Sequence, residues 1–70
     1  MPRPLALPEP WRSLALRHGG EGRLSTVLAV GPRSVYRWAH GGSRPIAVHR
    51  RQLRALFGEA GLETPTICLG

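Results

Sequence analysis

The sequence predicts an all-α fold, a compact bundle of four to five short helices. Apolar residues recur three and four positions apart in successive short segments, and glycine or proline pairs separate these segments. The chain has 70 residues, which is enough for one small domain that buries about 60% of the surface exposed by its unfolded chain. We therefore expect a single domain.

The first predicted helix follows a proline-rich lead, residues 1–9, which we expect to be extended. Pro10 is expected at the first helical position, where its missing N–H costs nothing. The pair Gly19-Gly20 ends the segment. One face of this helix is formed by residues at i, i+3, i+4 and i+7, namely Trp11, Leu14, Ala15 and His18.

The second and third predicted helices are joined by the break Ala29-Val30-Gly31. Glu21 lies near the start of the second helix, where a carboxylate favours the positive end of the backbone dipole. Pro32 opens the third helix, with Gly31 as its cap. The expected apolar face of the second helix consists of Leu24, Val27 and Leu28.

The third predicted helix separates its side chains into two faces when wound at about 100° per residue. Val35, Trp38 and Ala39 point to one side, so we expect Trp38 to anchor the helix on the core. The opposite third of the circumference carries a basic and aromatic set, Arg33, Tyr36, Arg37 and His40. Such a face suits the major groove of duplex DNA, which is wide enough to admit a helix.

The fourth predicted helix begins near Pro45, after the segment Gly41-Gly42-Ser43-Arg44. Gly61 is expected to stop it in a left-handed conformation, and Leu62 would then fold back on Phe57, as in a Schellman ending. Residues 64–70 are β-branched without a helical pattern, so we expect either a frayed tail or a short strand that contacts a second copy. The predicted domain spans residues 10–63. The apolar positions of the fourth helix are Ile46, Leu53, Leu56, Phe57 and Ala60.

The positive charge of the chain limits the classes of partner that it can bind. Ten basic residues stand against four acidic ones, for a net charge of +6, and every basic residue is arginine. Because the guanidinium fork grips phosphate or guanine with two hydrogen bonds, we expect a polyanionic partner. A GC-rich genome is the alternative explanation for a chain without Lys, Asp or Asn. That bias explains arginine over lysine, but not the excess of positive charge.

Catalytic and metal sites are not predicted. The chain has no Asp, its four Glu residues are scattered, and no Lys is present for a phosphate-binding loop. The three histidines lack ligand spacing, and the single Cys68 cannot form an internal disulfide. We expect no enzymatic activity, cofactor or metal. No apolar run approaches membrane-spanning length, and the closely spaced N-terminal prolines do not form a secretory signal, so we expect a cytoplasmic protein.

The stretch from Glu21 to Trp38 resembles the helix-turn-helix of the Cro-type phage repressor family. Family members carry a small residue where the two helices touch, here Ser25. The segment from Val35 to Pro45 is also similar to the family's hydrophobic-x-x-Trp, followed by a glycine and a later proline. Two positions depart from the pattern: Ala29 replaces a glycine of the turn, which alanine adopts only with some strain, and Gly31-Pro32 replaces a Ser or Thr cap. Family apolar positions are held by Leu24, Leu28, Val30, Val35 and Trp38.

The resemblance implies a lambda-repressor-like bundle whose second motif helix enters the major groove. By matching position, it implies DNA contacts from Arg33, Ser34, Tyr36 and Arg37. Arg33 and Arg37 would grip guanine or clamp phosphate, and Tyr36 would reach a phosphate or a thymine methyl group. The alternative for each arginine is an ordinary solvated surface residue. Further phosphate contacts are expected from Arg23, His40, Arg44, Arg50 and Arg51.

These observations predict a sequence-specific double-stranded DNA-binding regulator of transcription, a repressor from a phage or mobile element. We expect a homodimer that places two recognition helices about 34–36 Å apart, one turn of DNA, with the tail or the fourth helix at its interface. The alternative is a protein-binding module that keeps the helix-turn-helix scaffold but grips a partner, such as RNA polymerase or a toxin.

Overall fold

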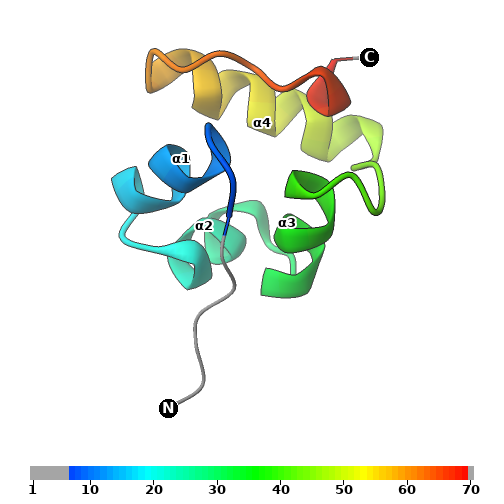
Figure 1. The fold of residues 1–70 in the computed structure, drawn as a ribbon, viewed down its shortest axis with the longest axis horizontal. Coiled ribbons are helices and arrows are strands. Elements are labelled where there is room, and N and C mark those ends of the chain that lie inside the picture. Colours follow the sequence, from blue (N-terminus) through cyan, green and yellow to red (C-terminus); the bar gives the residue numbers. More distant parts are fainter. Residues whose placement is uncertain (1–6, 70) are drawn as a thin grey trace.

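The computed structural model describes residues 7–69, which fold into α-helices and one short 3-10 helix, with no strand among them (Figure 1). The all-helical prediction is therefore confirmed for this part of the chain. Most of the lead expected to be extended, residues 1–6, lies outside the described residues. The elements are α1 (Trp11–Arg17), α2 (Glu21–Leu28), α3 (Pro32–Ala39), α4 (Ala47–Glu59) and the 3-10 helix η1 (Thr66–Cys68).

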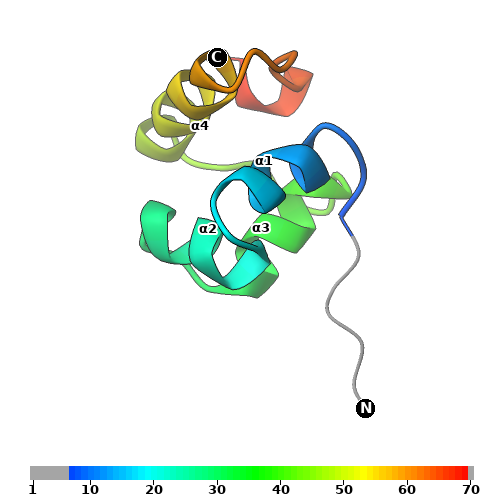
Figure 2. The same ribbon diagram turned by 90° about the vertical axis from the view of Figure 1, so that its left-hand side faces the viewer.

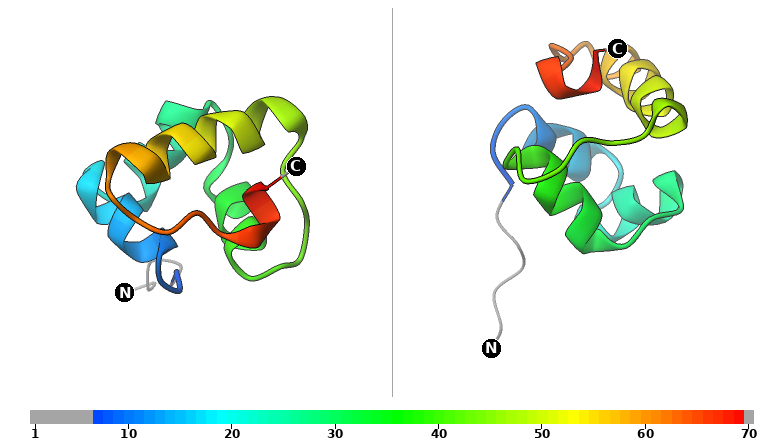
Figure 3. Two further views of the ribbon diagram at one scale, coloured as in Figure 1. Left: turned by 90° about the horizontal axis from the view of Figure 1, so that it is seen from above. Right: turned by 90° about the vertical axis from the view of Figure 1, so that its right-hand side faces the viewer.

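The longest helix, α4, lies on one side of the molecule, with α2 and α3 on the other side and α1 between them (Figures 1 and 2). Helix α2 packs against both α1 and α3. After α4 the chain returns along that helix and forms η1 against it (Figure 3). The first three helices thus form one sequential unit, which α4 and η1 cover from one side.

The core draws side chains from every helix and from the segment before α1. The rings of Trp11 and Phe57 pack in a T-shaped arrangement, with their centroids 5.2 Å apart and their planes at 89°. Trp38 is 6% exposed, so its predicted role as a core anchor is confirmed. Leu7, three residues before the predicted domain start, is also buried. The core consists of Leu7, Trp11, Leu14, Ala15, Leu24, Leu28, Val35, Trp38, Leu53, Phe57 and Cys68.

All four α-helices end in the same hydrogen-bonded motif. In each, one residue turns left-handed, and the next N–H donates to the carbonyl five residues back, as in a Schellman ending. The left-handed residues are Gly19, Ala29, Gly41 and Gly61, with φ of 95°, 57°, 78° and 70°. The bonds run from Gly20, Val30, Gly42 and Leu62 to Ala15, Ser25, Arg37 and Phe57, with N···O distances of 2.7, 3.0, 2.8 and 3.0 Å. The predicted stop at Gly61 and the return of Leu62 to Phe57 are confirmed.

Several predicted helix positions are corrected by the structure. Pro10 caps α1 instead of occupying its first position. Helix α4 begins at Ala47, later than predicted, and Ile46 is its cap, 63% exposed instead of buried. Val27 was expected on the apolar face of α2 but is 50% exposed. It lies about 100° round the helix from Leu28, and an eight-residue helix buries only a narrow stripe.

The C-terminal segment is neither a frayed tail nor a strand over residues 64–69. Its 3-10 helix places Cys68 in the core with no exposed surface, as expected for a small apolar side chain. Two arginines fix the backbone there: Arg54 donates to the Cys68 carbonyl at 3.3 Å, and Arg44 donates to the Leu69 carbonyl at 3.1 Å. The sequence pattern missed this segment because one buried side chain and two long-range hydrogen bonds hold it.

Candidate nucleic-acid interface

Helix α3 separates an apolar face from a basic face. Gly31 caps it, and Pro32 occupies its first turn, where a fixed φ and a missing N–H suit a helix start. Val35 is buried against the core, whereas Arg33 and Arg37 are exposed. Within residues 7–69 neither of these guanidinium groups has a hydrogen-bond or ion-pair partner. Their charge is therefore available to an external anion.

The connection between α2 and α3 is three residues long and brings the two helices into contact. Ala29 adopts φ 57° and ψ 40°, and Gly31 is extended, so the chain reverses tightly. The small Ser25 is 3% exposed, and its hydroxyl donates to the Gly22 carbonyl at 2.8 Å. This internal bond satisfies the buried hydroxyl. Ser25 is therefore buried as expected for a small residue at a helix–helix contact.

Tyr36 is less exposed to solvent than the two-face pattern of α3 suggested. It is half-buried and packs on the edge of the core. Its ring also lies 4.3 Å from the ring of His40, one turn later at the end of α3. Ser34 is half-buried too, in keeping with its position beside the core-facing residues. The outward face of α3 is therefore dominated by its two arginines.

Arginines outside α3 fall into two groups. Arg23 on α2 and Arg51 on α4 are exposed. Arg50 is half-buried and donates to the Pro45 carbonyl at 2.7 Å. Arg44 and Arg54 hold the C-terminal backbone in the same way. Because these three acceptors are neutral carbonyls, the positive charges remain, but the guanidinium groups are partly committed to holding the fold.

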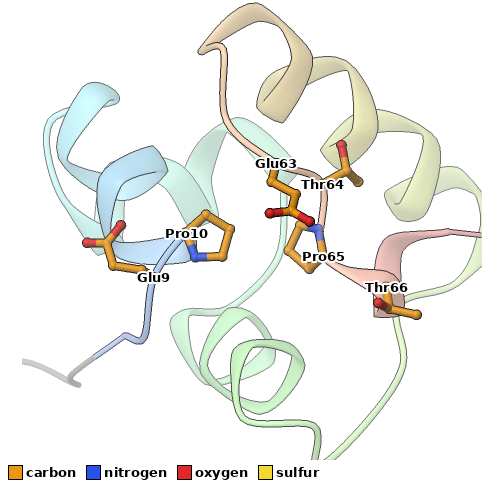
Figure 4. A pocket seen from close by; sticks show the side chains of 6 residues that line it. All are labelled: Glu9, Pro10, Glu63, Thr64, Pro65 and Thr66. Carbon is orange, nitrogen blue, oxygen red and sulfur yellow. The ribbon is translucent and has the colours of Figure 1, made fainter.

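Two of the surface pockets formed by the described residues lie away from α3. One, of about 330 Å³, lies between the start of α1 and the segment after α4, with Glu9 and Pro10 on one side and Glu63, Thr64, Pro65 and Thr66 on the other (Figure 4). The second, of about 400 Å³, lies between α1 and the start of α2. Among the described residues, no three His, Cys, Asp or Glu side chains are grouped to hold a metal ion.

None of the helices formed by residues 7–69 is long and apolar enough to cross a membrane. Comparisons of the chain with protein-family models, with curated proteins and with solved structures found no match.

Proposed function

We propose that this chain binds double-stranded DNA through α3. The observation that carries the proposal is the exposure of Arg33 and Arg37 on the face of α3 opposite the buried Val35 and Trp38. A helix with its side chains is about 10–12 Å across, and the major groove is about 12 Å wide. A helix held at the surface by its apolar face fits such a groove with its basic face inward.

The proposed recognition unit is a helix-turn-helix formed by α2, the three-residue connection and α3. In this arrangement α2 crosses the DNA backbone, and Arg23 on its surface contacts phosphate. The net charge of +6 favours a polyanion as the partner. His40 and Arg44, near the end of α3, extend the same basic set.

The proposed biological role is that of a Cro-like repressor, a cytoplasmic binding protein without catalysis. One recognition helix offers few base contacts, so we propose that two copies act as a twofold dimer. The described tail packs on its own chain, which leaves the start of α4 as the better dimer contact. Two of the exposed large apolar side chains, Ile46 and Val48, lie there.

DNA binding is tested by fluorescence anisotropy with labelled duplexes over a series of salt concentrations. The logarithm of the association constant should fall linearly with the logarithm of salt concentration, with a slope of about −0.9 for each phosphate neutralised. Arg33→Ala and Arg37→Ala should each weaken binding, and circular dichroism should show an unchanged fold because both side chains are exposed.

Arg51→Ala is the matched control, because it removes the same charge from α4, on the other side of the molecule from α3. It should weaken binding less than either α3 variant. Equal losses for all three variants would refute a specific α3 interface. Binding of RNA polymerase or a toxin that tolerates both salt and the α3 variants, without duplex binding, would favour the protein-binding alternative.

The dimer is tested by sedimentation equilibrium at micromolar concentrations, with and without duplex. A monomer under every condition would refute it. Val48→Asp should shift the mass toward the monomer, whereas Val27→Asp, an equally exposed valine on α2, should leave the mass unchanged.

A further inference from the structure

We infer that the half-site recognised by α3 is specified by guanines, two of them within three successive base pairs. This inference rests on the proposed DNA binding and adds the chemistry of the sequence that is read. Two observations support it: which hydrogen-bonding side chains of α3 face outward, and how far apart they lie along the helix.

On the outward face of α3, the exposed side chains that carry two parallel N–H donors are those of Arg33 and Arg37. Asparagine and glutamine read adenine with paired bonds, but the chain has no Asn and a single glutamine, Gln52. Gln52 lies on α4, where its Oε1 atom is hydrogen-bonded to Nδ1 of His49 at 3.0 Å. The ring of His49 in turn lies 5.5 Å from Trp38. The paired donor and acceptor that adenine requires is therefore absent from α3.

The other polar side chains of α3 are poorly placed to compete. Ser34 is half-buried beside the core-facing residues, and Tyr36 packs between the core edge and His40. Guanine offers two acceptors, O6 and N7, on its major-groove edge, which match the guanidinium fork. Base selection by α3 thus falls to Arg33 and Arg37, and both select guanine.

The spacing of the two arginines limits the spacing of the two guanines. Residues 33 and 37 lie one helical turn apart on the same face, about 6 Å along the axis. Successive base pairs are about 3.4 Å apart. For a helix that runs along the groove, this axial spacing of the two residues corresponds to about two base steps, and a tilted helix shortens it toward one step. Either orientation confines both guanines to three successive base pairs.

The test begins with selection of bound duplexes from a random pool by the full chain and by the Arg33→Ala, Arg37→Ala and Arg51→Ala variants. The parent protein should enrich two guanines within three base pairs. Each α3 variant should lose preference at one of these positions and keep it at the other. Arg51→Ala, which removes at most a phosphate contact, should keep both preferences because phosphate contacts do not select bases. Loss of one forked contact should reduce discrimination at that base pair by about 5- to 150-fold.

Replacing each selected guanine in turn by 7-deazaguanine removes the N7 acceptor and leaves base pairing intact. Each replacement should weaken binding of the parent protein by at least about 10-fold, the effect of one hydrogen bond from a charged donor. The variant that lacks the matching arginine should be insensitive to the same replacement. This pairing of protein and DNA changes assigns each arginine to one base.

The outcomes separate the inference from the proposed function. Absence of binding to any duplex at low salt overturns DNA binding itself. Salt-dependent binding without guanine enrichment, or with enrichment of adenine or thymine, overturns the guanine assignment and leaves DNA binding in place. Guanine enrichment that survives in both α3 variants also overturns the assignment.

Discussion

Ala29 provides the sharpest test of the fold, because it is the only left-handed helix end in the described chain that is not a glycine. For an alanine, the left-handed conformation costs about 1–2 kcal/mol. Glycine relieves this cost but adds about 0.4–1 kcal/mol of conformational freedom to the unfolded chain. Ala29 is exposed, so its methyl group contributes little burial. We therefore expect Ala29→Gly to stabilise the domain by about 0.8 kcal/mol, the difference between the middles of these two ranges.

In a domain of this size, that change raises the thermal midpoint by about 3–6 °C. The measurement is a circular dichroism melt at 222 nm, compared with urea unfolding at 25 °C. Two alanine substitutions in α4 and its ending serve as controls, one expected to lower the thermal midpoint and the other to raise it. Gly61→Ala meets no atom within 4 Å of the added Cβ but forces alanine to φ 70°, so it should lower the midpoint. Gly58→Ala also adds its Cβ to open space, within the helix, and should raise the midpoint.

A fall in the midpoint for Ala29→Gly, with both controls behaving as expected, would refute the left-handed turn between α2 and α3. It would also remove the tight connection on which the proposed recognition unit depends. No change in the midpoint would mean that the strain relieved at Ala29 only equals the cost of about 0.4–1 kcal/mol that glycine adds through the unfolded chain.

Three further predictions concern the core and the C-terminal segment. Phe57→Ala should cost about 3–5 kcal/mol, because the ring is fully buried against Trp11; a small domain holds about that much stability in total, so the variant should lack a cooperative melt. Burial raises the pKa of the Cys68 thiol from 9.0 to about 11, although the nearby Arg54 charge lowers it in part. The folded state then keeps a proton that the unfolded chain releases, so urea unfolding should show stability falling as the pH rises from 9 to 11, and falling less in Cys68→Ala. Arg54→Met removes the hydrogen bond to the Cys68 carbonyl and should speed the reaction of the thiol with an aromatic disulfide reagent, whereas Arg51→Met should not. Loss of the Arg54 charge raises the pKa of the thiol further, but access to the fully buried Cys68 limits the reaction; equal rates would contradict the role of Arg54 in holding the C-terminal segment.

Local signals predicted most of the helical architecture. Gly19, Gly61 and Pro32 mark helix boundaries through their own backbone preferences, and the structure places each as expected. Such signals depend on a residue and its immediate neighbours, so they can be recognised without knowledge of the rest of the fold. The strain at Ala29 was inferred instead from the resemblance of residues 21–38 to a helix-turn-helix whose turn usually carries a glycine at that position.

Positions determined by long-range packing were predicted less well. Ile46 and Cys68 were assigned the wrong environments because spacing alone does not show which apolar residue finds a partner. Whether a guanidinium group is free also depends on distant segments: Arg44 reaches a carbonyl 25 residues away. By contrast, the exposure of Arg33 and Arg37 follows from helical periodicity within α3 itself. The candidate interface was therefore predictable, whereas the hydrogen bonds from Arg44 and Arg54 to the C-terminal backbone were not.

The shared ending of the four α-helices has a consequence for the folding kinetics. Each stop uses only atoms within six successive residues, so the limits of every helix are encoded locally, although helices of 7 to 13 residues gain most of their stability from tertiary packing. The connections between the helices are short, so little loop closure slows their docking. We therefore expect rapid folding, on the microsecond to millisecond timescale.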